Sequence, residues 1–316
     1  MKNPPIGPGE PFQLLFNDLP EAVPSLPEEF RHIYPGDWQI PEIKGRPYVY
    51  TDFAISRDGR ITYNTPGYVG GSDITQTDTH DWWFMGFLRT RADAIMNGIG
   101  TVTLEAGTLW TAEDLYPPDG AAFAELRQME GYTKPPILVI LTHDAKLNYE
   151  AGTIQREDMH IVIATTPEGA AHAAQFDCKA TVDIHNLGDP MVDLEKTVSM
   201  LYSDYGVRNL LSEGGSTVQA GLFDKGLIDE EFVTWCPTLV GRSQDKFRPS
   251  YTEGVAWHPA TAPYSKPITL HRAGDLLYLG LLNEEDAERP ANVSRSCMGS
   301  TQSFGTSSLK VIKPKL

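Results

Sequence analysis

The sequence lacks the cysteine and histidine patterns of a disulfide framework or a zinc site. Its three cysteines, Cys178, Cys236 and Cys297, lie far apart and form no CxxC pair, which argues against both kinds of site. Its eight histidines show neither HxH nor HExxH spacing. The HxE and PCxxC motifs of the zinc deaminases are also missing. We therefore expect chemistry that uses no protein-bound metal.

The sequence also lacks blocks of positive charge and long apolar runs. It holds 26 Lys and Arg against 42 Asp and Glu, a net charge of −16, with no basic cluster, so we expect no nucleic-acid partner. No apolar run reaches the roughly 18 residues that suggest a membrane span. The first residues lack the apolar core of a signal peptide. These absences predict a cytoplasmic protein by default.

Three regions differ in composition along the 316 residues. Residues 1–45 are rich in proline and poor in periodic apolar runs, which predicts an arm over the surface with one short helix near residues 28–33. A disordered leader is the alternative. Residues 46–283 should form the folded domain. Residues 284–316 are charged and then rich in Ser and Gly, which predicts a flexible tail.

Strands and helices alternate through the expected domain. The expected strands cover residues 48–56, 92–97, 136–142, 160–164, 181–184, 208–211 and 231–235, and the expected helices cover residues 75–89, 121–130, 168–175, 191–202 and 216–225. Residues 268–272 and 276–282 should form a closing hairpin. This order predicts an α/β fold with a mostly parallel central sheet, helices on both faces and an antiparallel C-terminal edge.

One stretch joins a strand to a helix through two glycines, Ser212-Glu213-Gly214-Gly215-Ser216. Two glycines let the backbone approach a ligand closely, and the free N–H groups of a helix start suit a phosphate. Glu213 falls at the carboxyl end of the strand, where open α/β sheets bind ligands. A tight turn with a surface glutamate is the alternative interpretation.

Two other glycine-bearing turns follow strands, at residues 57–60 and 98–101. The carboxyl ends of parallel strands lie on one side of a sheet, so the three turns should converge on one crevice. This convergence predicts a nucleotide cofactor site. Gly98 and Gly100 match half of a dinucleotide fingerprint, but Thr103 stands where its third glycine would be.

The ordered set of motifs resembles the reductase domain of riboflavin biosynthesis, the C-terminal half of the bifunctional deaminase–reductase. The matching motifs are Arg46-Pro47-Tyr48, residues 54–60 (AISRDGR), residues 71–72 (GS), residues 88–95 (LRTRADAI), residues 98–102 (GIGTV), residues 211–217 (LSEGGST) and residues 226–230 (GLIDE). The resemblance implies a dihydrofolate-reductase-like three-layer α/β fold in a free-standing form, and it implies a homodimer.

The resemblance also implies an NADPH-dependent reductase that delivers a hydride to a C=N or C=O carbon, most like 5-amino-6-(5-phosphoribosylamino)uracil reductase. It assigns NADPH to Ile55, Gly98, Gly100, Thr101, Thr142, Gly214, Gly215, Ser216 and Thr217. It assigns the substrate to Ser72, Arg89 and Glu105, and catalysis to Glu213 and Arg60. Purely structural roles stay open for Arg60 as a turn residue, Arg89 as a helix end and Glu105 as a loop residue.

Glu213 is expected to hydrogen-bond the pyrimidine of the substrate. Because a carboxylate that lines a crevice makes few packing contacts, its replacement should lower turnover and change stability little. The proton donor stays open between water, Glu213 and water bound to Arg60. His143 or Lys146, after the strand at residues 136–142, could contact the 2′-phosphate of NADPH.

The sequence departs from the family after Glu105. There the family usually has Asp-Pro-x-Leu-Thr-x-Arg, whose arginine helps to hold the substrate phosphate, whereas this chain reads AGTLWTAEDL over residues 106–115. A phosphate without that partner would bind more weakly. Two alternatives therefore stay open: a reductase of secondary metabolism with another imine or carbonyl substrate, and a nucleotide-binding regulatory protein without activity.

Overall fold

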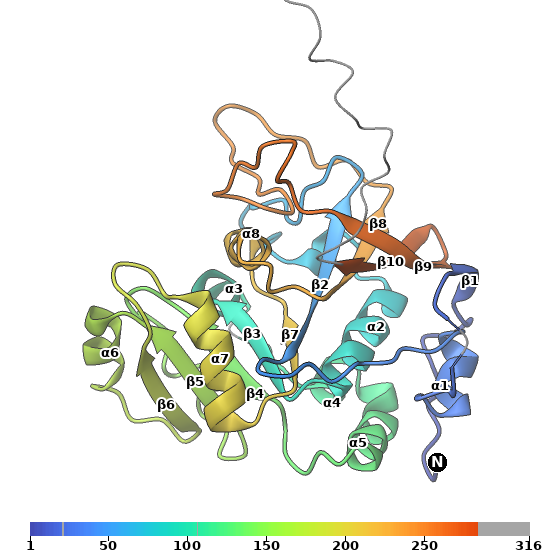
Figure 1. Ribbon diagram of the computed structural model, residues 1–316, viewed down its shortest axis with the longest axis horizontal. Coiled ribbons are helices and arrows are strands. Elements are labelled where there is room, and N and C mark those ends of the chain that lie inside the picture. Colours follow the sequence, from blue (N-terminus) through green and yellow to red (C-terminus); the bar gives the residue numbers. More distant parts are fainter. Residues whose placement is uncertain (21, 106, 284–316) are drawn as a thin grey trace, which may run out of the picture.

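The central strand of the molecule is β2, Tyr48–Ser56, which is buried along most of its length. The computed structural model describes residues 1–20, 22–105 and 107–283, and the predicted tail and Cys297 lie outside them. In the described residues, ten strands form one sheet in the order β1-β9-β10-β8-β2-β7-β3-β4-β5-β6 (Figure 1). The other strands are β1 Gln13–Asn17, β3 Ala94–Gly98, β4 Ile137–Leu141, β5 His160–Thr165, β6 Thr181–Asn186, β7 Asn209–Ser212, β8 Glu230–Cys236, β9 Ser265–Ala273 and β10 Leu276–Asn283.

The sheet is parallel from β8 to β6 and antiparallel from β8 to β1. Parallel strands are buried on both faces and read as continuous apolar runs, which is why β3, β4 and β5 could be recognised in the sequence. The predicted mostly parallel sheet with an antiparallel C-terminal edge is confirmed. One detail differs: β9 pairs with β1, so the closing hairpin is not itself the edge of the sheet.

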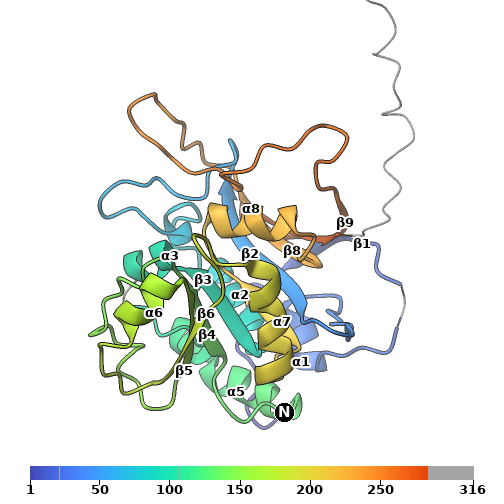
Figure 2. The ribbon, with the colours of Figure 1, turned by 60° about the vertical axis from the view of Figure 1, so that its left-hand side comes forward.

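Helices cover both faces of the sheet (Figures 1 and 2). They are α1 Glu28–Ile33, α2 Thr79–Thr90, α3 Ile99–Leu104, α4 Ala112–Leu115, α5 Gly120–Met129, α6 Pro167–Ala173, α7 Leu194–Tyr205 and α8 Ser216–Asp224, with 3-10 turns at Gly71–Asp73 and Pro117–Asp119. Apolar side chains of α1, α2 and α5 form the core on one face. Those of α7 and α8 form the core on the other face. The predicted three-layer arrangement is thus present.

The N-terminal arm is built into this core. The predicted short helix is confirmed as α1, and β1 adds a strand that the sequence pattern did not indicate. Phe12, Phe30 and Trp38 are buried in the core beside α2. The indole N–H of Trp38 donates to the buried carboxyl of Glu230 at 2.8 Å.

Two helix starts differ from the sequence prediction. The α2 helix begins at Thr79, because the carboxylate of Asp78 accepts a hydrogen bond from the backbone N–H of His80 and caps it. The α7 helix begins at Leu194, capped by Asp193, and not after Asp189-Pro190. In both cases several residues before the helix could act as caps, and packing against the sheet selects one.

Among the helices of the described residues, none is long and apolar enough to cross a membrane. In the same part of the chain, no group of three or more His, Cys, Asp or Glu side chains is placed to hold a metal ion.

Candidate active site

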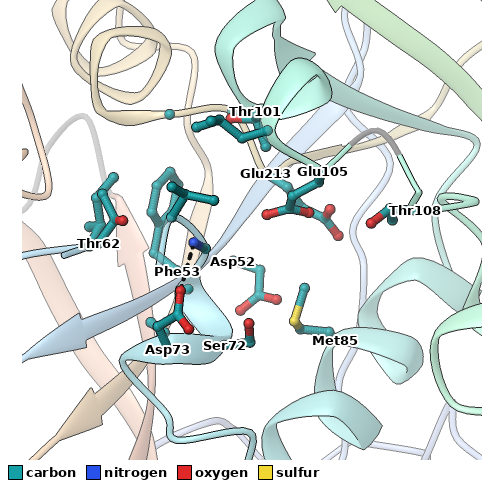
Figure 3. A pocket seen from close by; sticks show the side chains of 18 of the residues that line it. Asp52, Phe53, Thr62, Ser72, Asp73, Met85, Thr101, Glu105, Thr108 and Glu213 are labelled. Atoms are coloured by element: carbon teal, nitrogen blue, oxygen red, sulfur yellow. Dashed lines mark hydrogen bonds between the residues drawn. The ribbon is translucent and has the colours of Figure 1, made fainter. Parts of the chain in front are cut away.

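A cavity of about 840 Å³ lies at the carboxyl ends of β2, β3 and β7 (Figure 3). The turn after β3 contributes Gly100 and Thr101, and the turn after β7 contributes Glu213 and the residues that follow it. The long loops between β2 and α2 and between β8 and β9 lie above this end of the sheet (Figure 2). Thr62 and Pro249 of these loops also line the cavity.

The two turns that carry glycines meet in this cavity. A Cβ atom added to Gly215 would lie 3.7 Å from Oγ1 of Thr101, so the starts of α8 and α3 are neighbours. Gly98 and Gly215 precede these two helices, and no side chain caps either helix start. The first N–H groups of both helices therefore stay available to a ligand, and such N–H groups bind phosphate and other anionic groups.

The second glycine turn also shows why glycine is needed at one position for packing alone. A Cβ atom at Gly214 would come within 2.9 Å of Val218, whereas Gly100 has open space around it. Gly214 thus allows α8 to pack closely against its own turn. Gly100 and Gly215 leave room on the cavity side, so the turns fit the diphosphate of a dinucleotide.

An ion pair between Arg89 and Glu213 forms one wall of the cavity. Nε and Nη2 of Arg89 donate to the two carboxylate oxygens of Glu213, each at 2.7 Å. The side chains are only 1% and 6% exposed. The guanidinium also lies over the ring of Trp110, 5.1 Å from its centre. Within the described residues, Nη1 of Arg89 is buried without a hydrogen-bond partner, so this nitrogen can still donate to a ligand.

The cavity is rich in carboxyl groups and poor in cations. On α2, Asp81, Met85 and Arg89 line it at intervals of one turn, and Asp52 lines it from β2. The lining carboxyl groups are Asp52, Asp73, Asp81, Glu105, Asp114 and Glu213, and the one lining cation among the described residues is Arg89. Since Glu213 already engages Arg89, the remaining carboxyl groups of the cavity have no lining cation of their own among the described residues.

Burial changes the pKa of three of these carboxyl groups. Burial, together with the carboxylates of Asp81 and Glu213, raises the pKa of Asp52 well above its ordinary value, and Arg89 offsets part of this. Burial raises the pKa of Asp81 to about 7, although the nearby Thr234 and Thr75 lower it part of the way. Burial also raises the pKa of Glu105, which Arg89 opposes. A protonated carboxyl group is therefore available near neutral pH.

The structure brings most of the predicted site residues together. Nine of them line the cavity, namely Ser72, Arg89, Gly100, Thr101, Glu105, Glu213, Gly214, Gly215 and Ser216. The predicted residues outside its lining are Ile55, Arg60, Gly98, Thr142 and Thr217. Gly98 and Thr217 belong to the same two turns, and Ile55 belongs to β2.

Arg60 and Thr142 have structural contacts of their own. Nη1 of Arg60 donates to the carbonyl oxygen of Arg248 at 3.3 Å, which joins the two long loops. The hydroxyl of Thr142 is buried and accepts from the N–H of Ala145 at 2.9 Å. The assigned roles of both residues in binding and catalysis stay predictions.

Sequence reasoning missed Asp52 and Asp81. For Asp52 a signal was present, because a lone aspartate interrupts the β-rich run YVYTDFAIS. A charge in the middle of a buried strand needs an explanation. Asp81 gave no such signal, since charged residues are common at helix starts.

A sequence model of the RibD C-terminal domain matches residues 47–255. This chain belongs to that family. The resemblance seen in the motifs is therefore confirmed. This chain is 27% identical over 198 residues to 2,5-diamino-6-ribosylamino-4(3H)-pyrimidinone 5′-phosphate reductase of Archaeoglobus fulgidus. The alignment covers 62% of this chain and 83% of that relative. It is 30% identical over 197 residues to the enzyme of that name in Methanothermobacter thermautotrophicus, covering 62% of this chain and 80% of the relative.

Solved structures of the family share the fold. A pyrimidine reductase-like protein from Corynebacterium diphtheriae superposes with a TM-score of 0.60 at 16% identity, over 76% of this chain and 93% of that one. Acinetobacter baumannii RibD superposes with a TM-score of 0.55 at 21% identity, over 76% of this chain. This chain spans 59% of the length of that RibD. The predicted dihydrofolate-reductase-like α/β fold is confirmed.

The buried ion pair corrects the expectation that Glu213 contributes little to stability. In Glu213→Ala the guanidinium of Arg89 would stay buried without its counter-charge, which should lower the free energy of unfolding by about 3–5 kcal/mol. Urea denaturation measures this change. Asp144→Asn is the control: it breaks the pair with Lys146, which is 67% exposed, and should cost less than about 1 kcal/mol. Equal midpoints for Glu213→Ala and wild type would refute the structural role.

Proposed function

We propose that this protein is an NADPH-dependent reductase that adds a hydride to the C=N or C=O carbon of a small heterocycle. Its substrate would be of the ribosylaminopyrimidine class that the names of its relatives give. The observation that carries the proposal is the meeting of the uncapped starts of α3 and α8 with the Arg89–Glu213 pair in one cavity. A volume of about 840 Å³ is in the range of small-molecule sites.

When bound, the cofactor supplies the hydride, and the protein holds and orients it. Backbone N–H groups of residues 98–101 and 214–217 would bind its diphosphate. Ile55 and Thr142, near the carboxyl ends of β2 and β4, would contact its flanking parts. On the substrate side, Nη1 of Arg89 has no hydrogen-bond partner among the described residues, and Ser72, Glu105 and Glu213 line the same cavity. Arg60 would act from the loop at the rim.

Gly215→Val should abolish NADPH binding while the protein stays folded. The backbone of Gly215 has φ −64°, which every residue can adopt, and the nearest atom to an added Cβ is 3.7 Å away. The larger side chain would instead fill the space between the two helix starts, where the diphosphate belongs. Titration with NADPH and with NADH, in wild type and variant, measures the loss and also tests the proposed preference for NADPH. Wild-type affinity in the folded variant would contradict the assignment.

A second candidate function is the same reduction on a substrate without a phosphate group. The carboxyl-rich lining favours it, because a phosphate would meet carboxylates and find no free cation among the described lining residues. Asp114 in particular lies in the segment where the family carries its phosphate-binding arginine. Its carboxylate pairs with Arg156 at 2.5 Å, so that arginine is also engaged.

The two candidates differ in their preference for a phosphate. If the lining repels phosphate, the ribosylaminopyrimidine nucleoside should have a kcat/KM about tenfold or more above that of its 5′-phosphate, about 1.4 kcal/mol. Asp114→Asn removes one carboxylate from the lining, whereas Arg156 keeps its ion pair with Asp158. The variant should therefore lower KM for the phosphate ester and leave KM for the nucleoside unchanged. A strong preference for the ester in wild type would exclude the second candidate. NADPH binding without turnover of either compound would favour a regulatory protein.

Assembly as a homodimer and a cytoplasmic location remain proposals. The dimer rests on the family resemblance alone, since β1 covers the edge of the closing hairpin. Light scattering at several concentrations tests it. A constant mass of 34.9 kDa, that of one chain, would contradict a dimer.

A further inference from the structure

We propose that the carboxyl group of Asp52, supported by Asp81, donates the proton that completes the reduction. The inference rests on the proposed hydride transfer and adds the residue that supplies the proton. Its starting point is a group that the fold does not explain, an aspartate in the middle of the central strand.

Asp52 lies on β2 between β7 and β8 and is 8% exposed. Figure 3 shows its carboxyl group pointing into the cavity among Ser72, Met85 and Glu213. In the described part of the chain, no hydrogen bond to this carboxyl group is found. A buried carboxyl without a partner destabilises the folded state. Its position therefore indicates a role toward a ligand and not in the packing of the sheet.

Asp81 faces the same cavity from α2 and is 3% exposed. Arg89 lies two turns further along this helix, and Glu213 occupies two of its nitrogens. The carboxylate of Glu213 acts on Asp52, that of Asp78 acts on Asp81, and Tyr278 of β10 lies near both aspartates. Asp52 and Asp81 thus have no cation of their own among the described residues.

Two neighbouring buried carboxyl groups without a cation hold on to a proton. The raised pKa of Asp52 and the pKa of about 7 for Asp81 agree with this expectation. At neutral pH the pair therefore contains an O–H group that points into the cavity. A general acid must have this property to work at neutral pH.

The proton balance of the reduction follows. The hydride adds to the carbon of the C=N or C=O bond, and the π electrons of that bond move to the nitrogen or oxygen. That atom takes the proton of Asp52, and a carboxylate remains. Asp81 or solvent then returns a proton to Asp52. The substrate gains two electrons from the cofactor, and no further reactant is needed.

Asp52→Asn should lower kcat by about 10²–10⁴-fold, the usual range for loss of a general acid, and leave NADPH affinity unchanged. In wild type, kcat should fall as the pH rises through the pKa of the pair, because the acid loses its proton. This alkaline decline should disappear in Asp52→Asn. In Asp81→Asn it should move to lower pH, because the neighbouring negative charge that keeps Asp52 protonated is gone.

Asp73→Asn is the matched control. It removes another carboxyl group from the lining, but Asp73 accepts a hydrogen bond from the N–H of Gly70, and the alkaline decline should stay where it is in wild type. The proposal would be overturned if the alkaline decline of kcat moved as far in Asp73→Asn as in Asp81→Asn. It would also be overturned if Asp52→Asn kept the kcat and the pH profile of wild type.

A titration of carboxyl-13C-labelled aspartate by NMR, with Asp52→Asn to assign the signal, tests the proposal without substrate. We expect the pKa of Asp52 to lie well above the ordinary range of an aspartate, because the group is buried beside Asp81 and Glu213. Ionisation of both Asp52 and Asp81 below pH 6 would overturn the proposal even if pyrimidines are reduced. Conversely, a protonated Asp52 in a protein that reduces no ribosylaminopyrimidine would support the proton donor and refute only the proposed substrate.

Discussion

The buried ion pair between Arg89 and Glu213 fixes the geometry on which the rest of the site depends. Removing two charges from water is unfavourable, and only a close geometry with several hydrogen bonds offsets it. Here the guanidinium and the carboxylate meet through two bonds of 2.7 Å. The pair joins α2 to the end of β7, two elements that are 124 residues apart in the chain. It therefore sets how α2 lies across the carboxyl ends of the strands.

This position of α2 determines the charges of the cavity. With Arg89 directed at Glu213, the same face of the helix presents Asp81 toward Asp52 of β2. The described lining then offers two kinds of group. Helix N-termini at residues 98–101 and 214–217 offer N–H groups that suit anions. The side chains of Asp52, Asp81 and Glu105 offer carboxyl groups, which suit a neutral or cationic ring and proton transfer. A diphosphate would match the first kind of group, and an uncharged hydride acceptor would match the second.

Much of this arrangement could be predicted from the sequence, and the part that could not has a physical reason. The alternating, β-rich residues 48–56 located β2 to the residue, and the glycine turns located one wall of the cavity, because both signals are local. The start of α7 was wrong because Asp189-Pro190 and Asp193 carry the same local cap signal. The partner of Glu213 and the pairing of Asp52 with Asp81 depend on contacts between distant elements, which no local pattern records.

The carboxyl groups that line the cavity distinguish an enzyme from a protein that only binds a nucleotide. Backbone N–H groups at two helix starts would suffice to hold a diphosphate, and they place no demand on β2. A regulatory protein with this fold could carry an apolar residue in place of Asp52 and gain stability, because a buried carboxyl without a partner is unfavourable. Natural proteins keep such unfavourable groups mainly where chemistry needs them. The aspartate in the central strand is thus explained by a reaction that consumes a proton, and binding alone leaves it without a reason.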